Sequence, residues 1–344
     1  MKSKIDVLVD LQFGSTGKGL LSGYLGVEKG YEAVISCNAP NAGHTAYSPD
    51  TGEKFMHKVL PSAIFSPQLQ VVGIGPGAVF YIDRLMVEWQ AVCAYRDGLT
   101  LIIHEAACVA QGGDKMAEAE TLSRISSTMQ GSAEALIRKI RRIPGAIARD
   151  KELAILANVG SFGPVRVVNQ AEWLDIMGNK ESILVEGSQG YSLGLSSGFY
   201  PYCTSRDCTV GRVLADANLP IAWLRDTYGC ARVHPIRVGN TADGFSGEWY
   251  ADQTETSFEA LGVTPELTTV TQRVRRVASF SALQIREAMI MAHPTAVFLN
   301  FAQYDDMASA KAIDAIDTVA AEIGCGGVGY VGTGPLPTDI AEVG

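Results

Sequence analysis

The sequence predicts an α/β fold: an open, mostly parallel twisted sheet with helices on both faces and inserted loop and helical segments. Short apolar runs rich in β-branched residues alternate with helix-like segments, the pattern of buried parallel strands joined by helices. A glycine-rich loop joins the first strand to the first helix. A length of 344 residues suits about two domains or one large α/β unit, and with helices and strands alternating throughout we expect residues 1–344 to form a single domain.

The elements alternate from the N-terminus onward. The first apolar run predicts a strand over residues 5–12, and a helix follows over 20–25. Further strands are expected over 99–104, 183–186, 221–224 and 296–301, and further helices over 83–96, 132–143, 281–292 and 307–323. The stretches 111–149 and 242–271 interrupt the pattern, so we expect them to be insertions that carry mobile loops.

Composition and charge exclude several classes of protein. The chain has 28 Lys and Arg against 37 Asp and Glu, a net charge of −9, which argues against nucleic acid or an anionic membrane as partner. Its seven cysteines form no CxxC pair, so we expect reduced thiols and neither zinc nor disulfides. No apolar run reaches the roughly 18 residues that predict a membrane span. We therefore expect a cytoplasmic protein with small-molecule partners.

The loop at residues 14–19, GSTGKG, has the composition of a phosphate site. Consecutive amides at a strand-to-helix turn can surround phosphate oxygens, the helix N-terminus adds positive potential, and Lys18 supplies a point charge. The spacing from Gly14 to Lys18 is shorter than in the Walker motif. The alternative interpretation is an ordinary tight turn with a solvated lysine.

A second segment, NAPNAGHT at residues 38–45, places one histidine among small and amide residues. Backbone of this kind can approach a ligand closely, and His44 could donate to a developing oxyanion or polarise a carbonyl. On local grounds alone, a lone histidine is more often a structural group.

The two segments together resemble the adenylosuccinate synthetase family, whose chains open with a QWGDEGKG loop and continue to NAGHT. Here the residues read QFGSTGKG at 12–19 and NAGHT at 41–45. Further family-like pieces follow in order, namely LPS at 60–62, EGSQG at 186–190, YPYCTS at 200–205, RVRR at 273–276 and GTGP at 332–335. The chain looks shorter than ordinary members, mainly in its middle and late loops.

The resemblance implies a two-step ligation. A purine 6-oxo group takes the γ-phosphate of a nucleoside triphosphate, and the aspartate amine then displaces phosphate at C6. Phosphorylation is needed because a ring carbonyl oxygen is a poor leaving group. By position, Lys18 would contact the transferring phosphate, His44 would donate to the 6-oxygen or the phosphate, and the Gly43 carbonyl would face Mg²⁺. With Ser15, Lys18 and His44 form the implied catalytic set.

The resemblance also assigns three binding sets. The residues implied to bind the triphosphate are Gly14, Ser15, Thr16, Gly17, Lys18, Gly19, Gly43, His44, Thr45, Gln303, Gly332, Gly334 and Pro335. The residues implied to bind the nucleoside monophosphate are Ser15, Asn41, Ser127, Thr128, Arg142, Gln189 and Thr204. The residues implied to bind L-aspartate are Thr271, Arg273 and Arg275, since a planar guanidinium matches a carboxylate.

Arg142 occupies the position of a family arginine that crosses a homodimer interface and contacts the 5′-phosphate. The alternative is that Arg142 belongs to a solvated helix face.

One departure concerns the substrate. The family's loop aspartate, which is its general base and a Mg²⁺ ligand, is Ser15 here, and the neighbouring glutamate is Thr16. A hydroxyl cannot replace a carboxylate in that role, so an inert relative is one interpretation. The other is a changed substrate, because serine leaves room for the 2-amino group of guanine. This resembles the phage branch of the family, which makes 2-aminoadenylosuccinate from dGMP, and which would place the protein in the cytoplasm of a bacterial host.

A second departure concerns the phosphate donor. The family reads the guanine of GTP with a TKxD segment, and the aligned residues 300–303 here are NFAQ. The amide of Gln303 offers a donor and an acceptor, which suits adenine, so ATP or dATP is the expected donor. The alternative is that Gln303 only caps a strand end while backbone near residues 332–335 reads the base.

The sequence thus predicts an ATP-dependent carbon–nitrogen ligase that joins L-aspartate to dGMP with Mg²⁺. The expected products are N6-succino-2-amino-2′-deoxyadenylate, ADP and phosphate. One alternative is an ordinary adenylosuccinate synthetase acting on IMP with GTP, and another is a non-catalytic purine nucleotide-binding relative. Retention of Lys18, His44, Gln189 and the Arg273 and Arg275 pair argues against the last.

Overall fold

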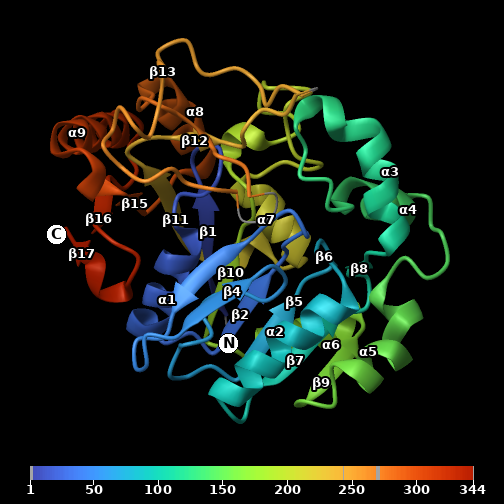
Figure 1. Cartoon of the computed structure of the whole chain (residues 1–344). Coiled ribbons are helices and arrows are strands. Elements are labelled where there is room, and N and C mark those ends of the chain that lie inside the picture. Colours follow the sequence, from blue (N-terminus) through green and yellow to red (C-terminus); the bar gives the residue numbers. More distant parts are fainter. Residues whose placement is uncertain (1–2, 243, 269–271, 344) are drawn as a thin grey trace.

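A ten-stranded sheet runs through the computed structural model, which describes residues 3–242, 244–268 and 272–343 (Figure 1). Its strand order is β17-β16-β15-β11-β1-β10-β2-β5-β7-β9, and the neighbours pair in parallel except β16 with β17. The strands are β1 (Lys4–Asp10), β2 (Ala33–Ser36), β5 (Val71–Ile74), β7 (Thr100–His104), β9 (Val165–Val168), β10 (Ser182–Glu186), β11 (Leu224–Arg232), β15 (Ala296–Asn300), β16 (Val328–Gly332) and β17 (Ile340–Glu342).

Smaller sheets and the helices complete the fold. The short strands are β3 (His44–Tyr47) with β4 (Lys54–His57), β6 (Val79–Phe80) with β8 (Cys108–Val109), and β12 (Ile236–Arg237) and β13 (Glu255–Thr256) on either side of β14 (Arg276–Ala278). The helices are α1 (Lys18–Lys29), α2 (Ile82–Tyr95), α3 (Gly112–Leu122), α4 (Ser132–Ile140), α5 (Glu152–Asn158), α6 (Gln170–Gly178), α7 (Val210–Ala217), α8 (Ala282–Ala292) and α9 (Asp306–Ile323). No helix among the described residues is long and apolar enough to cross a membrane.

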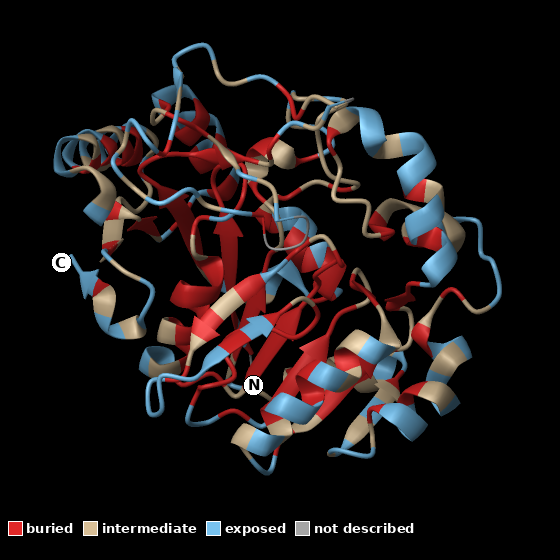
Figure 2. Cartoon of the chain, in the orientation of Figure 1, coloured by how far each residue is buried: buried red, intermediate tan, exposed pale blue. Residues whose placement is uncertain are grey.

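Two apolar clusters cover the two faces of the sheet, because successive strand side chains point in opposite directions. Leu8 of β1 packs in the cluster that contains Leu21 of α1 and Trp89 of α2. Val7 of the same strand packs in the other cluster, which α6, α7, α8 and α9 cover with residues such as Trp173. Figure 2 shows the central strands buried and the outer helix faces exposed. The predicted mostly parallel sheet with helices on both faces is confirmed.

One predicted strand is wrong. Residues 221–224 were expected to be extended, but Ile221–Trp223 form a 3₁₀ turn after Pro220, and the strand β11 occupies Leu224–Arg232. Its inner part contains Gly229, Cys230 and Ala231, which are small residues instead of a β-branched run, because the neighbouring chain approaches closely. A Cβ on Gly229 would lie 2.7 Å from the side chain of Leu11.

The two segments expected to be insertions lie at the end of the sheet where the central strands finish. The first holds α3, a 3₁₀ turn at Ser123–Ile125 and α4, and α4 ends three residues before the expected 143. The second holds only β13 as a regular element among its described residues. In Figure 1 the helical segment and the segment around β13 lie on two sides of the carboxyl end of β1. Their status as inserted, mobile segments stays a prediction.

Candidate active site

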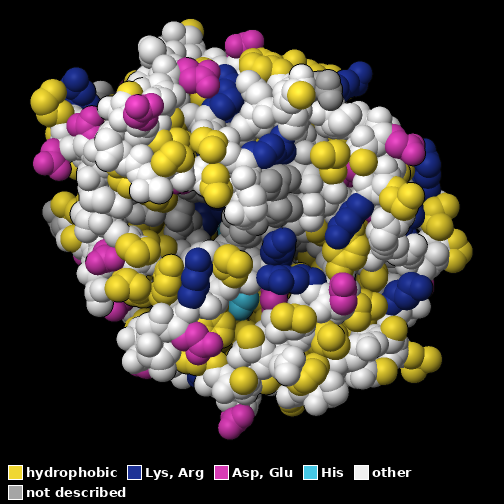
Figure 3. All heavy atoms as spheres, viewed as in Figure 1, with side chains coloured by type: hydrophobic (Ala, Val, Ile, Leu, Met, Phe, Trp, Pro, Cys, Tyr) yellow, Lys and Arg dark blue, Asp and Glu magenta, His cyan; other side chains and the backbone are white. Residues whose placement is uncertain are grey.

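A cavity of about 430 Å³ opens beyond the carboxyl ends of β1 and β10. The described residues that line it are Phe13, Gly14, Ser15, Thr16, Gly17, Lys18, Gly19, Asn41, Ala42, Gly43, His44, Thr45, Thr128, Gln189, Leu193, Ile236, Arg237, Val238, Ser246, Glu266, Leu267, Thr268, Arg275 and Phe301. Several Lys and Arg side chains surround the middle of this face (Figure 3). Despite the net charge of −9, the chain thus offers anionic ligands a basic opening.

The glycine loop follows β1 and adopts the left-handed conformation at three positions. The φ angles of Gly14, Ser15 and Gly17 are 91°, 57° and 94°. Gly17 precedes α1, and a Cβ there would lie 2.1 Å from the amide nitrogen of Asn300. Glycine is therefore required at this point of close approach. The backbone N–H groups of the loop lie at the N-terminus of α1, a position that favours the binding of anions.

Asp10, the last residue of β1, organises this loop. One carboxylate oxygen accepts the backbone N–H of Gln12 at 2.9 Å and of Gly14 at 3.1 Å. The other accepts the Thr16 hydroxyl and the ammonium of Lys18, the latter at 3.0 Å. The side chain of Asp10 is buried, so the pairing holds the loop against the strand end.

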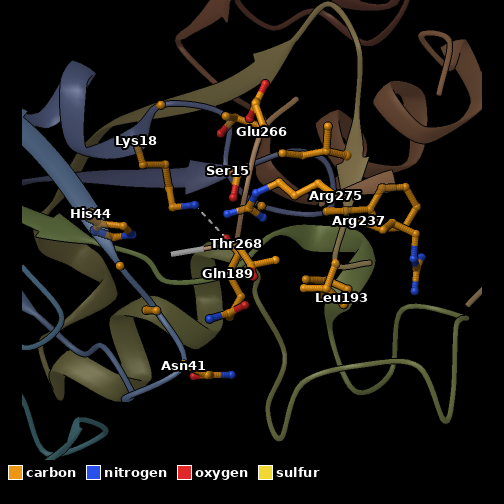
Figure 4. A pocket seen from close by; sticks show the side chains of 18 of the residues that line it. Ser15, Lys18, Asn41, His44, Gln189, Leu193, Arg237, Glu266, Thr268 and Arg275 are labelled. Carbon is orange, nitrogen blue, oxygen red and sulfur yellow. Dashed lines mark hydrogen bonds between the residues drawn. The ribbon is translucent and has the colours of Figure 1, made fainter. Parts of the chain in front are cut away.

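Lys18 lies between this carboxylate and the cavity. Its Nζ also donates to the carbonyl of Gln189 at 2.9 Å, and Figure 4 shows the side chain reaching across toward the Gln189 segment. The ammonium is thus directed by two acceptors from different strand ends. An incoming phosphate would meet a cation already placed at the cavity wall.

His44 is paired with a buried carboxylate. Its Nδ1 lies 3.1 Å from Oε2 of Glu186, the last residue of β10, which also accepts bonds from the hydroxyl of Ser22 and the backbone N–H groups of Ser62 and Ala63. Burial raises the pKa of the Glu186 carboxyl, but these hydrogen bonds outweigh it and hold that pKa below its usual value. An ionised carboxylate only accepts, so the proton is on Nδ1 and Nε2 remains for the cavity.

The segment before β14 folds back on itself at the cavity edge. Leu267 and Val274 form an antiparallel bridge, and the N–H of Thr268 donates to the carbonyl of Arg273 at 2.8 Å. Arg275 from this turn lines the cavity, and burial lowers its pKa to about 10. Arg273 instead donates to carbonyls of Gly239 and of residues 126 and 127.

Arg232, the last residue of β11, is fully buried and joins three parts of the site. Its guanidinium pairs with both carboxylate oxygens of Glu266 and donates to the carbonyl of Ser15 at 3.1 Å. It also lies over the ring of Phe301, 3.9 Å from the centroid. The glycine loop at Ser15, the segment at Glu266 and the end of β15 at Phe301 are therefore held by one cation.

Most of the predicted site residues meet at this cavity. Those that line it are Gly14, Ser15, Thr16, Gly17, Lys18, Gly19, Asn41, Gly43, His44, Thr45, Thr128, Gln189 and Arg275. Thr204 lies one contact away, accepting a hydrogen bond from the Asn41 amide at 3.3 Å, and Ser127 and Arg273 contact each other behind Thr128. The roles assigned to these residues stay predictions.

The remaining predicted residues are not among the lining residues. Gly332 lies next to the amide of Asn300, where a Cβ would come within 2.5 Å of its oxygen. Gln303 and Pro335 are exposed and Gly334 is half-buried, all beyond the ends of β15 and β16. Arg142 is exposed just after α4. Thr271 lies outside the described residues.

Sequence reasoning gave no role to Asp10, Glu186, Arg232 or Glu266. Three of them are charged residues at the carboxyl ends of adjacent buried strands, and that position at a parallel sheet is a signal for a ligand site. Glu266 has no such signal, because its partner Arg232 is 34 residues away in the sequence.

Among the described residues, no group of three or more His, Cys, Asp or Glu side chains could hold a metal ion. The carbonyl of Gly43 at the cavity wall is the oxygen donor predicted for Mg²⁺. One carbonyl donor fits a Mg²⁺ ion that takes most of its ligands from substrate phosphates and water.

Comparisons with known proteins agree with this geometry. The family model described as adenylosuccinate synthetase matches residues 7–152 and 150–317. The chain is 45% identical over 343 residues to the N6-succino-2-amino-2′-deoxyadenylate synthase of Vibrio phage phiVC8, covering 98% of this chain and 97% of the relative. It is 27% identical over 333 residues to the adenylosuccinate synthetase of Leuconostoc citreum, covering 86% and 76%.

A solved structure matches along the whole chain. It is the succinoaminodeoxyadenylate synthetase of cyanophage S-2L, bound to dGMP and to dATP as an energy donor. The TM-score is 0.90 at 39% identity, with 99% of this chain and 96% of that chain covered. By sequence and by structure, the chain belongs to the adenylosuccinate synthetase family, on the branch that holds these phage proteins.

Proposed function

We propose that the chain is a ligase that joins L-aspartate to dGMP at the expense of ATP or dATP. The purine 6-oxygen takes the γ-phosphoryl group, the aspartate amine attacks C6, and phosphate leaves. The products are N6-succino-2-amino-2′-deoxyadenylate, ADP or dADP, and phosphate. The observation that carries the proposal is Ser15 at the cavity wall of a chain 45% identical to a phage synthase of that product.

The geometry supports this substrate. Ser15 follows Gly14 in the left-handed conformation, and its carbonyl is fixed by Arg232, so the short hydroxyl side chain belongs to a rigid part of the wall. A guanine ring carries a 2-amino group beside N1, and serine offers that group space and an acceptor. We infer that Asn41, Thr128, Gln189 and Thr204 hold the monophosphate, with Ser127 behind them.

Lys18 and His44 supply the charge stabilisation that phosphoryl transfer needs. The ammonium of Lys18, directed by Asp10 and Gln189, would contact the transferring phosphate. Nε2 of His44, the ring nitrogen left by Glu186, would face the 6-oxygen or the phosphate. Mg²⁺ on the Gly43 carbonyl would neutralise phosphate charge when bound.

The triphosphate would occupy the loop at 14–19, with its base toward Gln303 and residues 332–335. The relative from cyanophage S-2L, bound to dATP, supports an adenine nucleotide as donor. We further propose a homodimer in which Arg142 reaches the partner's monophosphate, and the cytoplasm of a bacterial host as the compartment. An exposed arginine after α4 is available for such a contact.

The test is kcat/KM for dGMP, GMP and IMP side by side, with saturating L-aspartate and with ATP, dATP or GTP. We expect dGMP to exceed IMP and adenine nucleotides to exceed GTP. Ser15→Asp should depress turnover of dGMP, because a longer charged side chain crowds the ring edge and is partly desolvated.

Each result has a clear reading. A preference for IMP over dGMP would identify an ordinary adenylosuccinate synthetase. Absence of turnover with every monophosphate would favour a purine-binding relative without activity. Full activity of Ser15→Asp with dGMP would contradict the claim that Ser15 is needed to leave room for the 2-amino group.

A further inference from the structure

Glu266 is the one acidic side chain among the described residues that line the cavity. Apart from its pairing with Arg232, it has no part in the proposed reaction. Its side chain is 21% exposed. Burial raises the pKa of its carboxyl, but the charges of Arg232 and Arg275 and hydrogen bonds from Arg232 and Tyr304 hold that pKa below its usual value. The cavity wall therefore contains a fixed carboxylate.

The hydrogen bonds of this carboxylate leave capacity for a ligand. Oε1 accepts from Arg232 and from the Tyr304 hydroxyl at 3.3 Å, whereas Oε2 accepts from Arg232 at 3.1 Å. A carboxylate oxygen accepts about two hydrogen bonds, so Oε2 can take another donor. Because Arg232 is fully buried, the pair cannot swing into solvent and the carboxylate keeps its place.

Glu266 lies beside Arg275, the cavity-lining cation proposed to bind L-aspartate. The N–H of Arg275 donates to the backbone carbonyl of Glu266 at 2.9 Å, across the bridge between Leu267 and Val274. Figure 4 shows Glu266 and Arg275 on the side of the cavity where Ser15 lies. Glu266 and Arg275, on the two paired segments 266–268 and 272–275, thus present an anion and a cation to one ligand.

L-Aspartate carries two carboxylates and one ammonium. Guanidinium groups match the carboxylates and repel the ammonium, so the arginines alone would bind any dicarboxylate of that length. A fixed carboxylate beside them is the complement of the third charge. We propose that Glu266 binds the α-ammonium of L-aspartate and so selects the amino acid over dicarboxylates that lack the amine; this inference rests on the proposed function.

Glu266→Gln tests the assignment, because glutamine keeps the shape and an acceptor for Arg232 while removing the charge. We expect the KM for L-aspartate to rise by about tenfold or more, since hydrogen bonds to charged groups are the strong class. The inhibition constant of succinate, which has both carboxylates and no amine, should stay within about twofold. A purely structural pairing with Arg232 would shift both constants equally, and that outcome would overturn the inference.

Tyr304→Phe is the matched control. It removes a hydrogen bond to the same carboxylate without changing its charge, so the ratio of the aspartate and succinate constants should not move. A changed ratio in this variant would count against the charge argument.

One further measurement keeps the inference falsifiable. If Glu266→Gln does not fold, calorimetric binding to the wild-type protein decides: succinate should bind about tenfold more weakly than L-aspartate, and equal affinities would overturn the inference. The same binding data separate it from the proposed function. If the wild-type protein binds L-aspartate more tightly than succinate but does not turn over dGMP, the proposed function is contradicted, while the proposed contact between Glu266 and the ammonium is not.

Discussion

The carboxylate of Glu186 accepts a hydrogen bond from Nδ1–H of His44 and leaves Nε2 for the cavity. This is a positioning arrangement, because Glu186 is fully buried, is not among the described residues that line the cavity, and is paired with His44, which lines it. Its first oxygen accepts three donors from Ser22, Ser62 and Ala63, so the second is fixed in orientation. The same contacts hold the ring plane of His44.

We expect Glu186→Gln to lower kcat by about tenfold to a hundredfold with little change in the KM for dGMP, because a charge-assisted bond to the ring is lost. An amide NH₂ facing Nδ1 would also move the ring proton to Nε2. Two-bond ¹H–¹⁵N spectra of the histidines measure that change, with His44→Ala to assign the signal.

Ser22→Ala serves as the comparison, since it removes a bond to the same carboxylate without touching His44. Its kcat should stay close to the wild-type value. If Ser22→Ala loses as much activity as Glu186→Gln, then Glu186 acts only by holding the segment around Ser62.

At this scale the sequence predicts residues with local motifs and misses residues with distant partners. The cavity position of Lys18 and His44 follows from GSTGKG and NAGHT. Glu186 is missed because its partner His44 lies 142 residues away in the sequence. Asp10 is missed although its partners are near in the sequence, because nothing in the sequence shows that the loop folds back onto its carboxylate. A carboxylate at a strand end carries no local sign of what it will contact.

Among the elements, the segment 272–275 before β14 separates two arginines that the sequence treats as a pair. Arg275 faces the cavity, whereas Arg273 holds the carbonyls of residues 126 and 127 beside Thr128. Arg273 thus connects the proposed aspartate turn to the proposed monophosphate loop.

We therefore expect different kinetic effects from the two alanine variants. Arg275→Ala should raise the KM for L-aspartate about tenfold or more while changing that for dGMP little, since it removes charge-assisted bonds to a carboxylate. Arg273→Ala should raise both KM values, because the loop before Thr128 loses its support. Steady-state titration of each substrate distinguishes them, and a dGMP effect confined to Arg275→Ala would contradict this division.

Element prediction succeeds where periodicity is strong and fails where packing decides. The long helices α2 and α9 lie within one residue of the expected 83–96 and 307–323. The strand β11 was predicted too early in the sequence, because it lacks a run of β-branched residues. A central strand paired on both sides, here with β1 and β15, can be built from small and polar residues.

For the whole molecule, the proposed dimer makes a prediction that a monomer cannot satisfy. If Arg142 acts in the partner's site, each site combines Lys18 of one subunit with Arg142 of the other. In a dimer of one Lys18→Ala chain and one Arg142→Ala chain, both substitutions then fall in the same site. One site per mixed dimer is then intact. Co-expression or refolding of the two variants should recover about a quarter of the wild-type activity at low dGMP, by random pairing in a two-fold assembly.

Lys18→Ala mixed with Arg275→Ala is the control for this experiment. Both residues line the cavity of one chain, so every site in the mixed dimer keeps one defect. Measured at L-aspartate well below its KM, where the Arg275→Ala defect is expressed, the mixture should be no more active than its components. A Lys18→Ala and Arg142→Ala mixture that stays as inactive as its components would show that Arg142 does not complete a neighbouring site.

The amide of Asn300 lies where neither Gly17 nor Gly332 can carry a side chain: a Cβ would come within 2.1 Å and 2.5 Å of it. Its Nδ2 also donates to the carbonyl of Thr16 at 3.3 Å. The glycine loop, the end of β15 and the end of β16 consequently form one mechanical unit. Anyone redesigning the protein for another nucleotide donor would have to leave these three positions unchanged and vary Phe301 and Gln303, which lie just beyond them.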